Sequence, residues 1–353
     1  MCAGASLLVL AMIAGCAGVP AGEAIEGPVL AVLSYSPHEV ILVAPDTLDV
    51  IKRVRLRSGA TDPLALAELR MFVTAQCGGL GVDGDDAIGL IDLSQGGRIR
   101  YVKLPEQNPG SVESVGDGTV LVSHGVWDPG GIPVTRVDPE TGTVIGHELV
   151  ANAYNSLVVA AGSLWTSGPE GENIVCPDYT VRRTSLDLAT SDAYAAVGRG
   201  PFVAPDGDSP DTLLLATDYG ESACVSRVSA RSLEVLMSAT VEDLRNGIYA
   251  LISAGDLFVA RDSSGEDMAD PGGPLIVLDH ATLREVRRID VGGSVASIAA
   301  IGEIVYAVTW DTGELIEVDP MSGDVLRRVR LEGLDGKMLE LAAMDVVDVP
   351  GGP

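Results

Sequence analysis

Short runs of alternating apolar and polar residues recur along the whole chain, separated by Gly, Pro and Asp. The clearest unit runs from Gly302 to Leu326, where three such runs are separated by Asp-Thr-Gly and by Asp-Pro-Met-Ser-Gly. Alternation with a period of two predicts a β-strand that turns one face to a core, and the intervening residues are typical of tight turns. The unit therefore predicts a β-meander in an all-β fold.

The turn between the last two strands of this unit recurs at a nearly regular spacing. Its anchors are Ala44, Asp92, Asp138, Asp187, Ser229, Asp279 and Asp319. They lie about 46 residues apart on average, and a four-stranded propeller blade takes ~40–50 residues. An Asp or Ser at the anchor can accept a hydrogen bond from the backbone two residues on, which explains its recurrence. Seven turns predict a seven-bladed β-propeller of four-stranded antiparallel blades.

One strand further upstream of each later turn lies another apolar strand, as in Val120–Ser123, Leu164–Ser167 and Val305–Val308. We letter the strands of a blade A to D from the centre of the ring to its rim, so that these are B strands and the turns are C–D turns. The strands and turns resemble the YVTN-type repeats of bacterial surface-layer propellers and, more loosely, quinoprotein-like propellers. The resemblance covers residues from about 28 to 348. It implies a propeller architecture and a place outside the cytoplasm.

The strand count predicts how the ring closes. The first unit offers only three strands, Val29–Ser34, Val40–Ala44 and Val50–Leu56, while the chain ends with an unpaired apolar strand, Met338–Met344. Pairing the last strand with the first unit would complete the blade and remove open sheet edges. We therefore expect one propeller over residues 28–348, followed by a tail over residues 349–353, with no second domain.

The start of the chain resembles an export signal. An apolar run from Ser6 to Ala14 has the length of a secretory signal core, shorter than a membrane span. Ile13-Ala14-Gly15-Cys16 resembles the bacterial lipobox, which implies lipidation at Cys16 after removal of the signal over residues 1–16. Residues 17–27 would then form a flexible tether. A plain cleaved signal and an inconsequential apolar tail are the alternatives, because no Lys or Arg precedes the run.

Charge narrows the possible partners. The formal net charge of −27 argues against nucleic acid, whose phosphates need Lys and Arg. No internal stretch approaches the ~20 apolar residues of a transmembrane helix. The predicted location is the bacterial cell envelope, outside the cytoplasm, with a lipid anchor as the membrane contact and a monomeric state.

Basic residues gather on the predicted D strands of units six, seven, one and two. They are Lys52, Arg53, Arg55, Arg98, Arg100, Lys103, Arg287, Arg288, Arg327, Arg328 and Arg330. Charged side chains on edge strands prevent edge-to-edge pairing, which is the simpler interpretation. The alternative is a basic flank that faces anionic lipid headgroups.

The loops between strands B and C carry most of the candidate chemistry, because propellers commonly hold ligands on that face. Many acids fall in these loops, and Asp83, Asp85 and Asp86 have the oxygen ligands that calcium prefers. The full EF-hand spacing is missing, so solvated acidic turns are the simpler interpretation. We therefore expect no cofactor, with calcium as the alternative. The four histidines, His38, His124, His147 and His280, do not predict a zinc site.

Aromatic and polar residues at or just beyond the B strands are the candidate ligand contacts. They are Tyr35, His124, Asp218, Tyr219, Arg261, Asp262, Trp310 and Asp311. Aromatic rings among them would stack on a ring-shaped or sugar ligand. Trp165 instead falls in the apolar column of the B strands and is predicted to be core between blades.

Cysteines add one constraint. Cys176 and Cys224 fall in equivalent loops of consecutive units, so a disulfide between them is predicted. Cys77 would then be free or buried, and Cys2 lies in the part removed on processing.

No motif fixes a reaction. A Gly-x-Ser-x-Gly elbow, a phosphate loop and a dinucleotide fingerprint are all missing from the sequence. We therefore predict a binding or scaffolding module for an unidentified protein or small molecule, with no catalytic residue assigned. The alternative is a propeller enzyme, a lyase or hydrolase, that uses an acidic mouth and a divalent cation.

Overall fold

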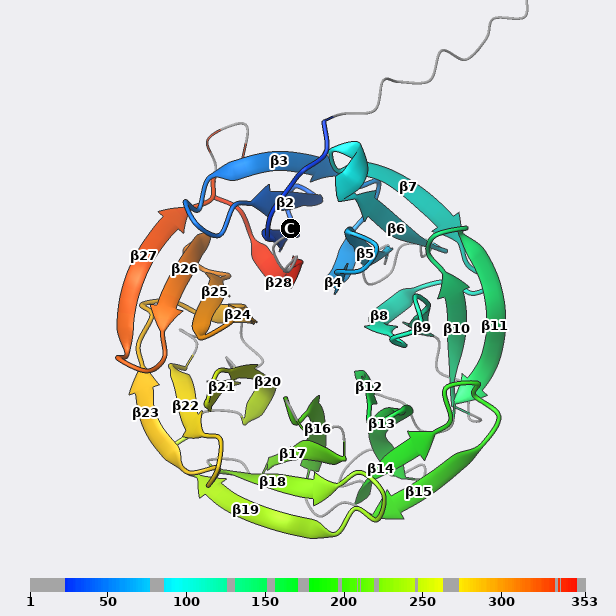
Figure 1. The fold of residues 1–353 in the computed structure, drawn as a ribbon, viewed down its shortest axis with the longest axis vertical. Coiled ribbons are helices and arrows are strands. Elements are labelled where there is room, and N and C mark those ends of the chain that lie inside the picture. The colour runs from blue at the N-terminus through cyan, green and yellow to red at the C-terminus, as the bar shows by residue number, and fades with distance from the viewer. Residues whose placement is uncertain are drawn as a thin grey trace, which may run out of the picture.

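The computed structural model is a ring of seven four-stranded antiparallel sheets around a central opening (Figure 1). It describes residues 23–76, 86–125, 131–150, 156–170, 178–195, 199–207, 209, 211–218, 222–244, 247–262, 273–333, 336 and 338–347. The predicted seven-bladed all-β propeller is confirmed. One turn of 3-10 helix, η1 (Leu93–Gln95), is the only helical element in these ranges. None of their helical segments is long and apolar enough to cross a membrane.

Each blade has its strands in the order A to D from the centre to the rim. Blade 1 contains β28 (Leu341–Val347), β1 (Val29–Ser34), β2 (Glu39–Val43) and β3 (Val50–Arg55); blade 2 contains β4 (Ala60–Leu66), β5 (Met71–Gln76), β6 (Ala87–Asp92) and β7 (Arg98–Lys103); blade 3 contains β8 (Pro109–Ser114), β9 (Val120–His124), β10 (Ile132–Asp138) and β11 (Thr143–Val150). Blade 4 contains β12 (Ser156–Ala160), β13 (Ser163–Glu170), β14 (Asp178–Thr184) and β15 (Ser191–Ala195); blade 5 contains β16 (Arg199–Pro205), β17 (Thr212–Asp218), β18 (Ala223–Ser229) and β19 (Val235–Val241). Blade 6 contains β20 (Ile248–Ala254), β21 (Leu257–Asp262), β22 (Leu275–Asp279) and β23 (Glu285–Ile289); blade 7 contains β24 (Val295–Ile301), β25 (Ile304–Thr309), β26 (Glu314–Asp319) and β27 (Asp324–Arg330).

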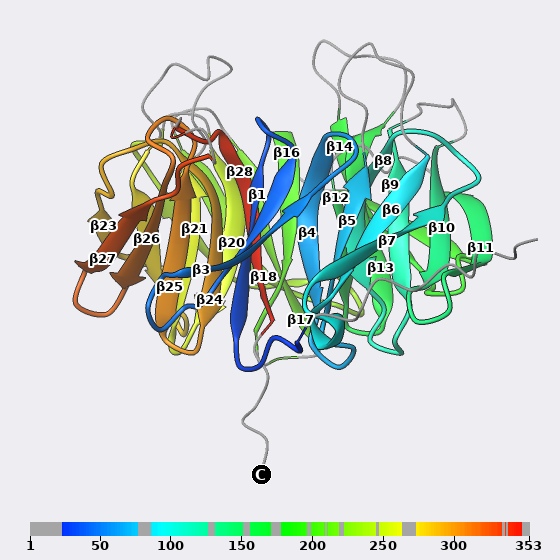
Figure 2. The same cartoon turned by 90° about the horizontal axis from the view of Figure 1, so that it is seen from above.

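The last strand closes the ring, as the strand count predicts. β28 pairs antiparallel with β1, with Val29 opposite Val347 and Leu33 opposite Ala343, and the two strands run side by side in Figure 2. The strand begins at Leu341 rather than at Met338. Met338 instead makes an isolated β-bridge with Glu332, inside the connection that leads from blade 7 into β28.

The C–D turns have the predicted hydrogen bonds. Asp319 accepts from the amides of Met321 and Ser322 at 2.8 and 3.2 Å, and the Ser322 side chain and amide lower the pKa of this carboxyl. Four of these turns end on a leucine with a positive φ, where Gly is the ordinary choice. These are Leu48, Leu188, Leu233 and Leu283. Leu283 is fully buried, so packing offsets the cost of its left-handed backbone.

The core lies between neighbouring blades. Trp165, Phe72 and Phe258 of the B strands are fully buried, and Trp165 packs with Val203 and Leu213 of blade 5. The prediction that Trp165 belongs to the core between blades is confirmed.

Basic side chains connect most blades to the next, in a pattern that the sequence did not reveal. Among the described residues, a basic side chain at six of the seven junctions donates to a backbone carbonyl in or beside the C–D turn of the following blade. The pairs are Lys52 to Gly96, Arg100 to Pro139 and Glu140, Arg136 to Leu186, Arg183 to Arg231, Arg227 to His280, and Arg327 to Pro45 and Asp46. A charged donor to a carbonyl is a strong hydrogen bond, so several rim residues hold the ring together as well as protecting its edge.

Candidate ligand-binding face

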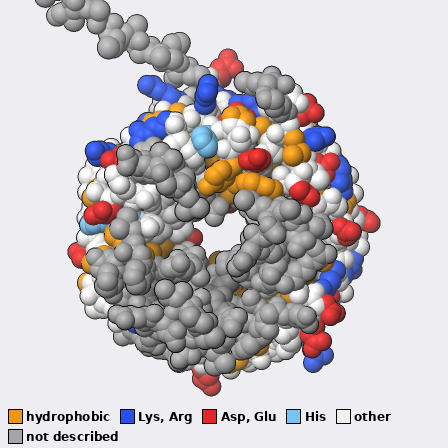
Figure 3. Space-filling model, turned by 180° about the vertical axis from the view of Figure 1, so that it is seen from behind, with side chains coloured by type: hydrophobic (Ala, Val, Ile, Leu, Met, Phe, Trp, Pro, Cys, Tyr) orange, Lys and Arg blue, Asp and Glu red, His pale blue; other side chains and the backbone are white. Residues whose placement is uncertain are grey.

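Two sets of connections leave the ring on the same side. Antiparallel strands alternate in direction, so the B–C loops emerge at the same end of each blade as the links between blades. We name this end the loop face and the opposite end, with the A–B and C–D turns, the turn face. Figure 3 looks onto the loop face and shows the opening through the ring, with apolar side chains beside it. A ligand on this face would meet several blades at once.

Three rings lie together on the loop face where blade 7 meets blade 1, and we name Tyr35, His38 and Trp310 the aromatic patch. The centroid of the Tyr35 ring lies 6.1 Å from that of Trp310, with the planes tilted by 58°, and 6.3 Å from that of His38. Tyr35 is 38% exposed and His38 is exposed too. The patch therefore offers apolar ring surface with polar edges to solvent.

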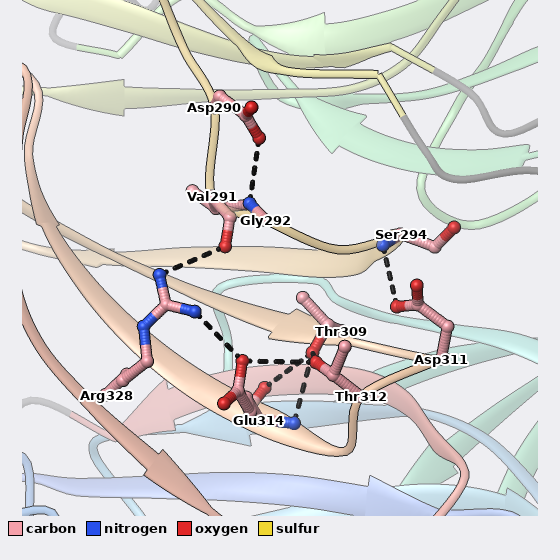
Figure 4. A network of polar contacts seen from close by, with 9 residues as sticks. All are labelled: Asp290, Val291, Gly292, Ser294, Thr309, Asp311, Thr312, Glu314 and Arg328. Carbon is pink, nitrogen blue, oxygen red and sulfur yellow. Dashed lines mark hydrogen bonds and ion pairs between the residues drawn. The ribbon is translucent and has the colours of Figure 1, made fainter.

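Backbone hydrogen bonds fix two of these rings in place. The Tyr35 amide donates to the carbonyl of Glu340 at 2.8 Å, and the Trp310 amide donates to the carbonyl of Ser294 at 2.8 Å. The Ser294 amide donates in return to Asp311 Oδ1 at 2.7 Å (Figure 4). Asp311, predicted as a ligand contact, thus also secures the B–C loop that carries Trp310.

A network of polar side chains holds the same B–C loop in place (Figure 4). Thr309 Oγ1 lies 2.6 Å from Thr312 Oγ1 and accepts from the Glu314 amide at 3.1 Å. Glu314 forms an ion pair with Arg328 at 3.1 Å, and Arg328 also donates to the carbonyl of Val291 at 3.2 Å. The network connects the B–C loop, strand β27 and the link from blade 6, so the loop is preorganised.

The link into β28 packs against this loop at a glycine. Gly313 has φ +65°, and a Cβ there would lie 2.9 Å from both the Leu339 carbonyl oxygen and the Met338 side chain. Only Gly permits this approach. The contact brings exposed Met338 and exposed Glu340 to the margin of the aromatic patch.

The loop-face ends of the B strands bury a layer of polar side chains. Its members are Ser34, Thr74, Gln76, Ser123, His124, Thr166, Ser167, Thr217 and Thr309. Buried polar groups normally have hydrogen-bond partners. Within the described residues, Ser34 Oγ, Thr166 Oγ1 and Ser167 Oγ have none. The sequence shows this layer only as Ser and Thr at the ends of apolar runs, a signal too common to be read in advance.

His124, predicted as a ligand contact, lies inside this layer with only 1% of its surface exposed. Its Nδ1 is 3.2 Å from the Gln107 carbonyl and its Nε2 is 2.8 Å from Thr135 Oγ1, which also lies 2.9 Å from His147 Nδ1. Burial lowers the pKa of His124. Both ring nitrogens are therefore engaged inside blade 3 rather than presented to a ligand.

The remaining predicted contacts are placed only in part. Asp218, Arg261 and Asp262 end β17 and β21 at the loop face, while Tyr219 lies outside the described residues. Of the predicted calcium ligands, Asp83 and Asp85 lie outside them as well. Asp86 forms an ion pair with Lys103 at 3.2 Å. Among the described residues, no group of three or more His, Cys, Asp or Glu is arranged to hold a metal, and the calcium site stays a prediction.

The structure does not test the predicted disulfide between Cys176 and Cys224 or the predicted lipidation at Cys16. Cys224 is partly buried, lies 3.5 Å from Ser226 Oγ and has no disulfide partner among the described residues. Cys176 and Cys16 lie outside the residues that the structure describes. The disulfide and the lipidation stay predictions.

No protein-family model matches the chain, and no curated protein matches it in sequence. Its fold is similar to solved structures of low sequence identity. One is a functionally unknown protein from Desulfotomaculum acetoxidans, with a TM-score of 0.63 and 12% identity over 89% of this chain and 99% of that one.

Two further similar structures are bacterial β-propeller proteins. AztD from Citrobacter koseri has a TM-score of 0.57 and 12% identity over 93% of this chain and 100% of the other. The dihydro-heme d1 dehydrogenase NirN in complex with DHE has a TM-score of 0.59 and 15% identity, over 92% of this chain and 76% of the other. At such identities the likeness establishes the fold alone.

Proposed function

We propose that this protein is a binding module of the bacterial cell envelope that holds a ring-bearing ligand, most naturally a carbohydrate, on the aromatic patch. The supporting observation is the pair of exposed Tyr35 and partly buried Trp310, whose backbones are held by hydrogen bonds at the junction that closes the ring. Aromatic faces stack on the C–H face of a sugar, and carboxylates accept its hydroxyl hydrogen bonds. Asp311 follows Trp310 in the chain, Glu340 accepts from the Tyr35 amide through its backbone carbonyl, and both acidic residues are exposed.

Preorganisation is the reason to expect useful affinity. A ligand that binds a surface loop usually has to order that loop, which costs binding free energy. Here the network around Thr309 and Glu314 already orders the turn that carries Trp310. Little of the stacking energy should then be lost on binding.

The proposed lipid anchor agrees with this placement of the site. Ile25 packs on the turn face, where its amide donates to the carbonyl of Leu93 at 2.9 Å. Six residues separate Cys16 from Glu23, the first described residue, and the seven Cα–Cα steps between the two span at most roughly 25 Å. An anchor at Cys16 would therefore hold the turn face near the membrane and leave the loop face directed away from it.

A glycan array of neutral and acidic oligosaccharides, followed by calorimetry with any sugar that binds, tests the proposal. Trp310→Ala and Tyr35→Ala should each weaken binding about tenfold, which corresponds to ~1.4 kcal/mol. Met321→Ala is the matched control, because Met321 is 59% exposed on the turn face. Binding that survives both patch substitutions, or an array without a binder, contradicts the proposed function.

A further inference from the structure

Arg182 on β14 differs from seven other arginines of this acidic chain. Each of those seven faces a carboxylate, in the pairs Arg53–Glu39, Arg136–Asp117, Arg227–Asp206, Arg231–Asp211, Arg288–Glu285, Arg327–Glu317 and Arg328–Glu314. Arg182 has no carboxylate at ion-pair distance among the described residues. Its Nε is buried and has no hydrogen-bond partner there.

A second unpartnered donor lies next to it. Thr166 on β13 is directly opposite Arg182 in the strand register, so the two side chains are neighbours on one face of blade 4. Thr166 is 0% exposed, and its Oγ1 also has no partner within the described part of the chain. These two neighbouring groups, each without a partner among the described residues, can both donate to the oxygens of one bound group.

Packing places this pair between blades 3 and 4. Leu164 lies on the same side of β13 as Thr166, because side chains alternate along a strand, and it packs with Leu121 and Val134 of blade 3. Arg183, the next residue of β14, points to the other side and donates to the carbonyl of Arg231 in blade 5. Arg182 as a whole is only partly buried, so part of the residue contacts solvent although its Nε is buried.

The chemistry of the two groups selects a negatively charged oxygen ligand. The edge of a guanidinium formed by Nε and a terminal nitrogen presents two parallel N–H donors, which match two oxygens of one acid group. A threonine hydroxyl can donate a third hydrogen bond. We propose that Arg182 and Thr166 form a binding site for an oxyanion, either a carboxylate or a tetrahedral sulfate or phosphate group of a ligand.

The overall charge makes unspecific anion binding a poor explanation for any effect found here. A net charge of −27 repels anions from the surface at long range. An anion that binds must therefore gain its affinity from local donors. The Arg182 site lies between blades 3 and 4, whereas the aromatic patch lies between blades 7 and 1. The proposal therefore does not depend on the function proposed above.

Thermal unfolding of the full chain in sodium sulfate, sodium phosphate and sodium acetate, each matched in ionic strength with sodium chloride, tests the site. At least one oxyanion should raise the Tm of the wild type with a saturable dependence on concentration. Arg182→Gln should lose that increment, and the isosteric Thr166→Val should lose at least half of it. Arg183→Gln is the control, because it removes the same charge from the adjacent position on the opposite face.

Sulfate also stabilises proteins by exclusion from their surface. That effect is equal in all four proteins and does not saturate, so an equal rise in all four would overturn the proposal. A response to acetate identifies a carboxylate ligand, and one confined to sulfate and phosphate identifies a tetrahedral group. Failure of every oxyanion to act on the wild type also overturns it.

Stability in anion-free buffer separates a binding site from a structural arginine. Arg182→Met keeps the apolar stem and removes an unpartnered charge, so the Tm without oxyanion should stay the same or rise. A structural role predicts a fall. A fall in Tm together with an unchanged anion response would contradict the assignment even if Arg182→Gln failed to fold.

Discussion

Shortening Leu341 to Ala should weaken the closure of the ring by an amount that can be worked from its surroundings. Leu341 begins β28 and is 0% exposed. It packs at the junction where Tyr306 and Val308 of blade 7 meet Leu30 of blade 1. A buried Leu→Ala substitution costs about 2–5 kcal/mol, from lost burial and from the cavity left behind. The upper half of that range applies if backbone pairing with β1 prevents the site from collapsing.

Urea unfolding followed by far-UV circular dichroism measures the effect. With an m-value of about 3 kcal/mol per M, the midpoint should fall by ~1 M. Leu326→Ala is the matched control, since Leu326 is 46% exposed on the outer strand β27 and should change stability by less than about 0.5 kcal/mol. Equal shifts for the two variants would refute the idea that β28 holds the ring closed.

Four other expectations follow from features described above. Leu283→Ala should destabilise by about 2–5 kcal/mol, and Leu283→Gly should cost little more, because relief of the positive φ offsets part of the additional loss of burial; a much larger loss in the Gly variant on urea unfolding would argue against backbone strain there. The folded-state pKa of His124 lies below its unfolded value of about 6.5, so the unfolded state binds more protons as pH falls and stability should decline below about pH 6.5. His124→Asn should flatten this decline in the urea midpoint. An unchanged slope of midpoint against pH would show that other groups cause it. With a functional basic export signal, the wild type should partition into detergent and Cys16→Ser should not, whereas equal partitioning would exclude lipidation. Millimolar calcium should raise the Tm more than sodium chloride of equal ionic strength, and Asp85→Asn with Asp86→Asn should remove the difference; identical responses to the two salts would leave only solvated acidic turns.

The architecture could be predicted because its signals are local and repeated. Alternation within strands such as β25 and the Asp at C–D turns such as that of Asp319 are fixed by hydrogen bonds a few residues apart. Ring closure followed from counting strands. The sequence pattern placed the last strand three residues too early, at Met338–Met344 rather than Leu341–Val347, because Leu339 is apolar and fully buried although it lies in the preceding connection.

The candidate site could be predicted only in part, because its contacts join distant parts of the chain. Tyr35 and Trp310 were each expected at the mouth, but their contact exists only because the first and last blades become neighbours on closure. His124 shows the opposite case. A polar residue at the end of a B strand looks like a loop contact, yet His124 is the last residue of β9, is buried and has partners for both ring nitrogens. The pairing of Arg182 with Thr166 depends on strand register across a long loop, which composition does not encode.

The shared construction of blade 1 affects how the protein can be made. β1 is among the first strands to leave a ribosome or a translocation channel, and its partner β28 is the last. At about 5–20 residues per second, some tens of seconds pass between them. During that time β1 presents an unpaired apolar edge, which other chains can join. Any product that stops before Leu341 keeps this edge for its lifetime, so we expect prematurely terminated chains to need chaperones or to be degraded, while complete chains escape both.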